Sequence, residues 1–282
     1  MKLFPTIYRV YRIKIYPRVQ HIKGSGKIGA ILRFLASLSL KRYPFGTNVL
    51  EKEWKTLIIL DGCRYDLFTT WLGKECDYII SVASSTPEWI KKTFYGKNCS
   101  NIIYVSANPF VSNFILRKLL GKNPFFRLEE VWRYGWDEKL KTVPPYKVTK
   151  AALSMIKQYP GKRIIIHYLQ PHEPFIGKKK LIRKGVSREV IYGKKVGSIW
   201  NDLEYGKLTK EEVWEAYYYN LDLVMKEVKR LIQKVEKMIE GKIILTSDHG
   251  NHFGEANIYG HPPHLRTEEL VKVPWLVITK NS

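Results

Sequence analysis

Two hydrophobic runs that each end abruptly in an acidic residue constrain the fold of this 282-residue chain most strongly. The first run leads from Leu57 into Asp61, and the second leads from Ile243 into Asp248. An apolar, largely β-branched run of this kind is typical of a buried parallel strand, which brings its last residue to the edge of the sheet where α/β proteins bind ligands. We therefore expect Asp61, Asp248 and His249 to meet there. Buried carboxylates beside an imidazole indicate a metal site, because a cation offsets their desolvation.

Further apolar runs alternate with helical patterns along the chain. This alternation predicts an α/β fold with a doubly wound, mostly parallel central sheet flanked by helices. The runs with the length and composition of strands are Lys55–Leu60, Tyr78–Val82, Asn101–Val105, Arg163–Leu169, Lys242–Thr246 and Val273–Ile278. The segments with helical spacing are Pro87–Phe94, Val111–Leu120, Lys147–Gln158 and Lys210–Ile239.

The longest predicted helix, Lys210–Ile239, carries its own start and stop signals. Thr209 and Glu212 have the spacing of a capping box, and Gly241 supplies a stop before the next strand. Lysines fill the side of the helix opposite its apolar stripe, which indicates a solvated face rather than a binding site. These residues are Lys226, Lys229, Lys234 and Lys237.

The segment Tyr43–Gly46, with the sequence YPFG, places a boundary near residue 50. It divides the chain into a basic N-terminal arm (1–50) and an α/β domain (51–282). Within the domain, residues 177–206 contain GKKKLIRKG and YGKK, which predicts an irregular basic insertion that is either a substrate lid or a surface loop. Arg and Lys interrupt the apolar stretches of the arm, so it does not span a membrane. The arm either makes peripheral contact with an anionic membrane or glycan, or packs on its own domain.

Lys and Arg outnumber Asp and Glu by 48 to 26, and the net charge of +22 favours anionic partners. Nucleic acid is disfavoured because no zinc-finger spacing, RNP pattern or helix-turn-helix accompanies the charge. The cysteines Cys63, Cys76 and Cys99 are odd in number and lack a CxxC spacing, which indicates neither a disulfide framework nor a thiolate zinc site. We expect a reduced compartment and a cytoplasmic location, at the inner face of the membrane if the arm binds lipid.

Four segments carry residues suited to one site. In the first, Gly62 permits a tight turn after Asp61. In the second, Ser84, Ser85 and Thr86 precede Pro87, where hydroxyls either cap a helix or face an anion at its N-terminus. The third segment is IIIHYLQPHEPF, and the fourth is TSDHGNHFGE with the GHPPH that follows it. Five of the seven histidines follow predicted strand ends, which favours a functional site over purely structural histidines: His172, His249, His252, His261 and His264.

The ordered set DGxRxD, a hydroxyl before Thr-Pro, PHEPF, TSDHGxxxGE and GHP resembles the alkaline phosphatase superfamily in its sulfatase-like branch. The resemblance covers residues 55–278. It implies one or two divalent cations, Zn, Mn, Mg or Ca, with Asp61, Asp248 and His249 as ligands. It also implies that His261 binds a second ion or contacts the substrate.

The same resemblance implies a nucleophile two residues before the proline of its motif, which selects Ser85, with Thr86 and Ser84 as alternatives. His172 corresponds to a residue that contacts the substrate anion or assists the leaving group. Arg64 either pairs with ester oxygens or forms an ion pair with Asp66 or another acid. At lower rank, His264 is a substrate contact, and His252 and Glu255 lie near the site, with Glu255 orienting the ligands.

The resemblance implies a metal-dependent hydrolase of phosphate or sulfate esters, in which a divalent cation activates a serine hydroxyl. True sulfatases continue their nucleophile motif with Pro-Ser-Arg, whereas this chain has Pro87-Glu88-Trp89. That departure favours an unmodified serine and phosphate esters. Two alternatives stay open: a phosphotransferase acting on glycan or lipid head groups, and a non-catalytic protein of the same fold that binds anionic glycans or membranes.

Overall fold

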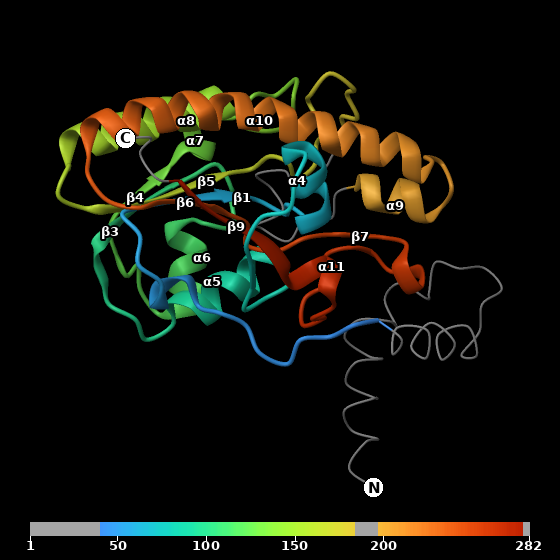
Figure 1. The fold of residues 1–282 in the computed structure, drawn as a ribbon, viewed down its shortest axis with the longest axis horizontal. Helices are drawn as coiled ribbons and strands as arrows, with labels where there is room; N and C mark the ends of the chain where they lie inside the picture. Colours follow the sequence, from blue (N-terminus) through green and yellow to red (C-terminus); the bar gives the residue numbers. More distant parts are fainter. Residues whose placement is uncertain (1–39, 184–196, 279–282) are drawn as a thin grey trace, which may run out of the picture.

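One seven-stranded sheet runs through the middle of the molecule (Figure 1). The computed structural model describes residues 40–183 and 197–278, so residues 1–39 of the predicted arm and 184–196 of the predicted insertion lie outside it. The strands of the main sheet are β1 (Thr56–Leu60), β2 (Tyr78–Ile80), β3 (Cys99–Ser106), β4 (Phe125–Glu130), β5 (Arg163–Tyr168), β6 (Ile243–Thr246) and β9 (Lys272–Ile278). Their order is β2-β9-β6-β1-β5-β3-β4. Two short strands, β7 (His252–Phe253) and β8 (Tyr259–Gly260), form a separate pair.

The main sheet is mostly parallel, which confirms the predicted fold class. Strand β1 pairs in parallel with β5 and β6, and β3 pairs in parallel with β4 and β5. Only β9 is antiparallel to its two neighbours, β6 and β2. The carboxyl ends of β1, β3, β5 and β6 therefore open onto one edge, where open α/β sheets bind ligands.

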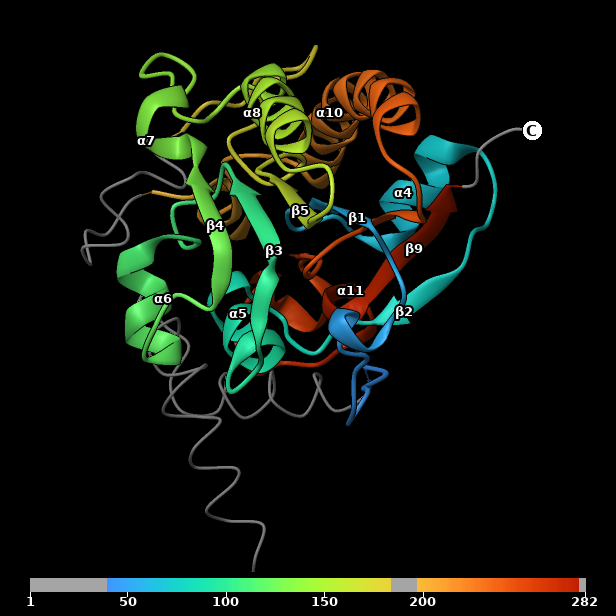
Figure 2. The same ribbon diagram turned by 90° about the vertical axis from the view of Figure 1, so that its left-hand side faces the viewer.

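Helices cover both faces of the sheet (Figures 1 and 2). One face carries α4 (Tyr65–Leu72), α8 (Pro145–Gln158) and α10 (Lys210–Met238), and the other carries α5 (Thr86–Phe94) and α6 (Asn113–Leu120). Shorter elements are η2 (Val49–Glu51), α7 (Val131–Gly135), α9 (Ile199–Glu204), η4 (Glu255–Asn257) and α11 (Glu268–Val271).

The alternation of side chains along β1 links the two halves of the core. Ile58 and Leu60 lie in the cluster shared with α8 and α10, whereas Leu57 and Ile59 lie in the cluster shared with α5 and α6. All four side chains are fully buried. A strand that is apolar on both faces is what a parallel sheet between two helical layers requires.

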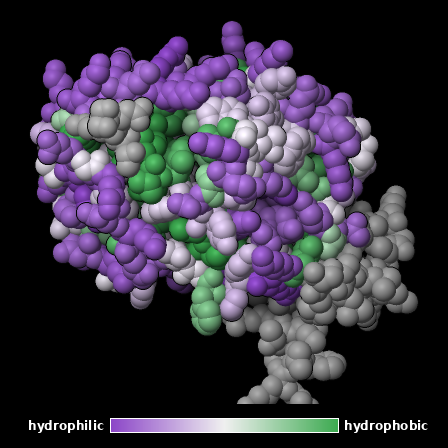
Figure 3. Space-filling model, in the orientation of Figure 1, coloured by the Kyte–Doolittle hydropathy of each residue, from purple (hydrophilic) through white to green (hydrophobic). Residues whose placement is uncertain are grey.

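Helix α10 begins as the sequence predicts. The Thr209 hydroxyl accepts a hydrogen bond from the Glu212 N–H at 3.1 Å, and the Glu212 carboxylate accepts one from the Thr209 N–H at 2.8 Å. The predicted solvated face is also confirmed, because Lys226, Lys229 and Lys234 are exposed together with Lys237. Figure 3 shows hydrophilic side chains along the edge of the molecule where α8 and α10 run.

One part of the predicted organisation differs from the structure, and for the described end of the arm the structure matches one of the two predicted alternatives. The insertion at 177–206 is not wholly irregular, because α9 forms inside it and buries Ile199, Trp200 and Leu203. The last residues of the predicted arm pack on the domain, where the Tyr43 N–H donates to the Arg266 carbonyl at 2.9 Å. The boundary near residue 50 remains a prediction.

Candidate active site

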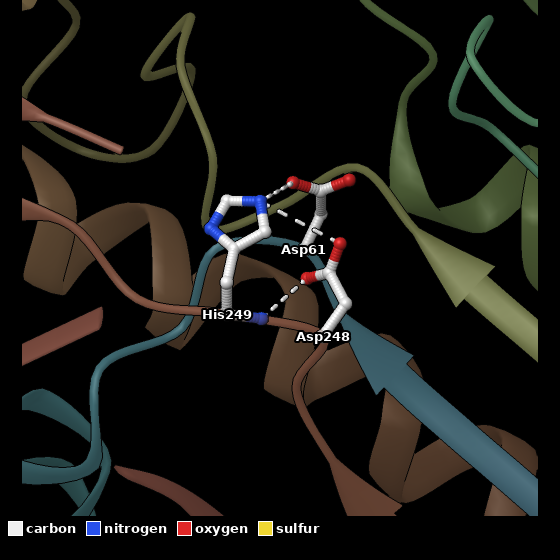
Figure 4. Close-up of side chains that lie close together, drawn as sticks. All are labelled: Asp61, Asp248 and His249. Atoms are coloured by element: carbon white, nitrogen blue, oxygen red, sulfur yellow. Dashed lines mark hydrogen bonds and ion pairs between the residues drawn. The ribbon is translucent and has the colours of Figure 1, made fainter. Parts of the chain in front are cut away.

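The structure brings Asp61, Asp248 and His249 together at the carboxyl edge of the sheet (Figure 4). Asp61 directly follows β1, and Asp248 and His249 follow β6. One ligand atom from each of the three buried residues lies within 4.8 Å of the others. His249 Nε2 is 3.9 Å from Asp61 Oδ1 and 3.6 Å from Asp248 Oδ2. These side chains are close enough to share one cation, and their role as ligands stays a prediction.

The hydroxyl of Thr86 completes this cluster. Thr86 Oγ1 donates a hydrogen bond to Asp248 Oδ2 at 2.8 Å and lies 3.4 Å from His249 Nε2 and 3.5 Å from Asp61 Oδ2. Thr86 is the first residue of α5, whose N-terminal amides and dipole favour an anion. The arrangement therefore places a hydroxyl, two carboxylates and an imidazole beside an anion-favouring helix end.

Ser85 and Ser84, the other two hydroxyl residues of this segment, lie differently. Ser85 is the N-cap residue of α5 and lines an outer groove of about 680 Å³ together with Pro87 and Tyr95. The Ser84 hydroxyl donates to the Pro262 carbonyl at 2.8 Å. The geometry therefore favours Thr86 as the nucleophile over Ser85, which the motif spacing selects.

The turn after β1 helps to fix the position of Asp248, one of the predicted metal ligands. Gly62 has a φ of +63°, and its N–H donates to Asp248 Oδ1 at 3.1 Å. A Cβ at this position would lie 3.0 Å from Asn251 Nδ2 and 3.3 Å from His172 Cδ2, so the turn requires glycine for space as well as for conformation. His249 Nδ1 lies 2.9 Å from the Gly250 carbonyl, which assigns the N–H to Nδ1 and leaves Nε2 as the acceptor that faces the carboxylates.

Two residues that the sequence analysis missed surround Asp61. Asn108 Nδ2 donates to Asp61 Oδ2 at 2.5 Å, and His167 Nε2 lies 3.1 Å from the same oxygen. Burial alone would raise the pKa of Asp61, but the contact with His167 and the electrostatic influence of the surrounding imidazoles outweigh it and hold the pKa well below its usual range. Asp61 is therefore a carboxylate at neutral pH.

The rings of His172 and His261 lie next to the predicted ligands Asp61, Asp248 and His249, which are called the ligand cluster below. Their ring centroids are 5.0 Å apart, and the His261 ring lies 4.5 Å from that of His249. His172 Nδ1 is 2.8 Å from the Glu173 carbonyl, and His261 Nδ1 is 2.8 Å from Asn251 Oδ1. His172 and His261, two of the three predicted substrate contacts, are therefore grouped with the predicted metal ligands.

Arg64 makes ion pairs within the protein instead of facing the cluster. Its guanidinium binds Asp66 through Nε at 2.8 Å and Nη2 at 2.6 Å, and Nη1 binds Glu255 at 2.7 Å and the Asn251 carbonyl at 2.9 Å. His252 is buried between Glu255 and Thr267. Because all three guanidinium nitrogens are engaged, the geometry supports the ion-pair alternative for Arg64 over contact with ester oxygens.

Glu173, from the PHEPF segment, caps a helix. Its carboxylate accepts hydrogen bonds from the Ser198 hydroxyl and from the Ile199 N–H, the latter at 2.6 Å, at the start of α9. Burial raises the pKa of Glu173. The carboxylate next to His172 in the sequence is therefore directed to α9.

His264 lies at the outer groove rather than at the ligand cluster. Its Nδ1 is 2.8 Å from Glu88 Oε1, and its N–H donates to Glu88 Oε2 at 3.0 Å. Lys92 pairs with the same carboxylate at 2.9 Å. Burial alone would raise the pKa of Glu88, but the bonds from His264 and Lys92 outweigh it and lower the pKa to about 2.

We expect Glu88 to make folding stability depend on pH below neutrality. Because its pKa is lower in the folded than in the unfolded chain, its contribution is complete above pH 4.5 and is lost as the pH falls towards 2. Glu88→Gln should remove about 1–2 kcal/mol at pH 7, after allowance for solvent screening, and much less at pH 3. Urea unfolding of both proteins at pH 7, 5 and 3 checks this.

The control for this prediction is Glu138→Gln, which changes an exposed ion pair with Lys141 and should alter stability by less than about 0.5 kcal/mol. An equal loss of stability by Glu88→Gln at all three pH values would contradict the prediction.

The ligand cluster fits a divalent cation. Asp61 Oδ1 is buried and, within the described part of the chain, has no hydrogen-bond partner, although Oδ2 of the same carboxylate is bonded. It faces His249 Nε2, and Thr86 Oγ1 lies beside them. Two carboxylates, an imidazole and a hydroxyl match the oxygen and nitrogen ligands of Zn, Mn and Mg. A bound cation would offset the desolvation of an oxygen that otherwise lacks a partner.

The fold of this chain is similar to that of solved structures with low sequence identity to it. A solved structure similar to this chain is the soluble domain of lipooligosaccharide phosphoethanolamine transferase A from Neisseria meningitidis, with 15% identity over 85% of this chain and 80% of that chain, at a TM-score of 0.52. The integral membrane protein itself is 16% identical over 97% of this chain and 58% of that chain, at a TM-score of 0.52. A protein in the alkaline phosphatase superfamily from Vibrio parahaemolyticus is 12% identical over 89% of this chain and 68% of that chain, at a TM-score of 0.42.

No protein-family model and no curated protein matches the sequence. The chain spans less than two thirds of the length of the membrane transferase. That transferase is an integral membrane protein, and it gives no support to the predicted cytoplasmic location. Among the described residues, no helix has both the length and the apolar character needed to cross a membrane.

Proposed function

We propose that this protein is a metal-dependent enzyme that transfers the phosphoryl-type group of an anionic ester, with Thr86 as its nucleophile. The observation that carries the proposal is the position of Thr86 Oγ1, 2.8 Å from Asp248 Oδ2 and 3.4 Å from His249 Nε2. A cation bound by Asp61, Asp248 and His249 would lower the pKa of the hydroxyl and offset charge on the transferred group. The net charge of +22 supports an anionic substrate.

The residues of the chain account for each bond that changes. In the first half of the reaction, Thr86 Oγ1 forms a bond to phosphorus, its proton leaves on the side of Asp248 Oδ2, and the ester P–O bond breaks. The departing alcohol takes up a proton, and His172 and His261 are the neighbouring imidazoles that could donate it. In the second half, an incoming hydroxyl attacks phosphorus, loses its proton and releases Thr86 Oγ1, which regains one.

The incoming hydroxyl distinguishes two forms of this function. Water as the acceptor makes the protein a phosphatase or phosphodiesterase, and an alcohol of a glycan or lipid makes it a transferase. The motifs are compatible with a phosphatase or phosphodiesterase. The similarity of fold to a phosphoethanolamine transferase is equally compatible with a transferase. Sulfate esters fit the same site, and the absence of Ser-Arg after Pro87 favours phosphate.

The test uses the purified full chain, loaded separately with Mn, Zn, Mg or Ca. An aryl phosphate, an aryl phosphodiester and an aryl sulfate are assayed with and without an acceptor alcohol. We expect turnover of at least one phosphate ester, and a phosphorylated alcohol in the product mixture identifies a transferase. Stoichiometric cation without turnover of any ester would favour the binding-protein alternative, and failure to bind any of the cations would overturn the proposal.

A further inference from the structure

His167 is a buried group that the proposed chemistry does not use. It is the fifth residue of β5 and its side chain has no solvent exposure. Its Nε2 lies 3.1 Å from Asp61 Oδ2 and 3.9 Å from Asp248 Oδ2. The nitrogen therefore lies near both predicted carboxylate ligands, one from the turn after β1 and one from the loop after β6.

Tyr104 determines which ring nitrogen of His167 carries the hydrogen. The Tyr104 hydroxyl is buried in β3 and lies 2.9 Å from His167 Nδ1. A buried hydroxyl donates its hydrogen to an acceptor, and His167 Nδ1 is the acceptor next to the Tyr104 hydroxyl. The hydrogen of a neutral His167 is therefore on Nε2, the nitrogen that faces the carboxylates.

The Nε2–H does not form an in-line hydrogen bond with either carboxylate. Despite the 3.1 Å separation, Nε2 has no hydrogen bond of good geometry among the described residues. Because Nε2 lies 3.1 and 3.9 Å from the two carboxylates, its N–H attracts both and reduces their mutual repulsion, which is large for like charges at a buried site.

The ring of His167 also contacts the helix that carries Thr86. It packs edge-on against Trp89 of α5 with a centroid distance of 6.4 Å. Asn108 holds Oδ2 of Asp61 from another side, so Oδ1 is left to face His249. One imidazole therefore contacts both carboxylates and the nucleophile helix.

We propose that His167, oriented by Tyr104, is a positioning residue that holds Asp61 and Asp248 at the spacing required to bind the cation. It acts through the two carboxylates and does not contact the transferred group. This inference rests on the proposed function, because it assigns a role in that same cation site. Residues of this kind behind metal ligands contribute about 10–100-fold to metal affinity.

The experiment compares cation binding by the full chain and four variants. Affinity for Mn²⁺ is measured by calorimetry, and the visible spectrum of bound Co²⁺ reports the ligand geometry. His167→Leu should weaken Mn²⁺ binding about 10–100-fold and shift the Co²⁺ spectrum. His167→Gln, which keeps an N–H donor, should recover part of the affinity, and Tyr104→Phe should weaken binding by less than His167→Leu.

The matched control is His252→Leu, which removes another fully buried imidazole whose partners are Glu255 and Thr267. It should leave Mn²⁺ affinity and the Co²⁺ spectrum unchanged, although it also costs stability. Wild-type affinity and spectrum in folded His167→Leu and Tyr104→Phe would overturn the inference; if His167→Leu does not fold, Tyr104→Phe alone decides. Failure of the unmodified protein to bind either cation would instead overturn the proposed function itself.

Discussion

Thr86→Val is expected to reduce ester turnover at least about 10³-fold, because the variant keeps the shape of the side chain and removes the attacking oxygen. That factor corresponds to about 4 kcal/mol of transition-state stabilisation. Thr86→Ser should keep turnover within about tenfold of the unmodified protein, since it retains the hydroxyl beside Asp248. Steady-state kinetics with the preferred aryl ester checks both values.

Ser85→Ala is the matched control for Thr86→Val. The two hydroxyls are adjacent in sequence, but Ser85 faces the outer groove and its side chain makes no capping hydrogen bond in α5. We expect turnover to change less than about tenfold. A 10³-fold loss of turnover in Ser85→Ala, with turnover retained in Thr86→Val, would instead identify Ser85 as the nucleophile, as the motif spacing predicts.

Asp248→Asn is expected to weaken cation affinity more than about 100-fold and to abolish measurable turnover. The amide oxygen of Asn can still accept the N–H groups of Gly62 and His249, which now bind Asp248 Oδ1 at 3.1 and 3.0 Å, so the turn should persist. The charge at Oδ2, beside Thr86 and His249, is lost. Calorimetric titration with Mn²⁺ or Zn²⁺ and metal analysis of the purified variant measure the effect.

The control for Asp248→Asn is Asp222→Asn, which alters a partly exposed ion pair between Asp222 and Lys226 on α10. It should bind cation and turn over ester like the unmodified protein. Removal of the cation from the unmodified protein by a chelator should also stop turnover, and adding the cation back should restore it. Full cation affinity in Asp248→Asn would exclude Asp248 from the ligand set.

The central strands of the fold could be predicted because their sequences are unambiguous. Strands β1, β5 and β6 are largely buried on both faces, and their sequences are mainly apolar. Strand β4, with the sequence FFRLEE, was missed because it is an edge strand with half-exposed, charged positions. Helix α9 was missed because lysines dominate the segment around it, and its stability comes from tertiary burial of Trp200 and from Glu173.

The site could be predicted only in part, for geometric reasons. Polar residues at the ends of apolar strands are easy to detect in a sequence, and this pattern identified Asp61, Asp248 and His249. The same rule could have identified Asn108, just after β3. His167 lies inside a strand, where a histidine has the same pattern as any core residue. The choice between Ser85 and Thr86 depends on the extended backbone of Ser85, which points successive side chains in opposite directions, and motif spacing does not encode that.

The PHEPF segment has a consequence for how this chain can vary. Phe175 exchanges two backbone hydrogen bonds with Leu181, and Glu173 holds the first residues of α9. The chain after Phe175 is therefore tied back to the PHEPF segment twice, at Leu181 and at the start of α9. The residues that hold it, Phe175 and Glu173, are both within a few residues of His172. We therefore expect changes of sequence or length between Leu181 and the start of α9 to leave the position of His172 unaltered, because the Phe175–Leu181 pairing and the hydrogen bonds of Glu173 stand between them and the imidazole.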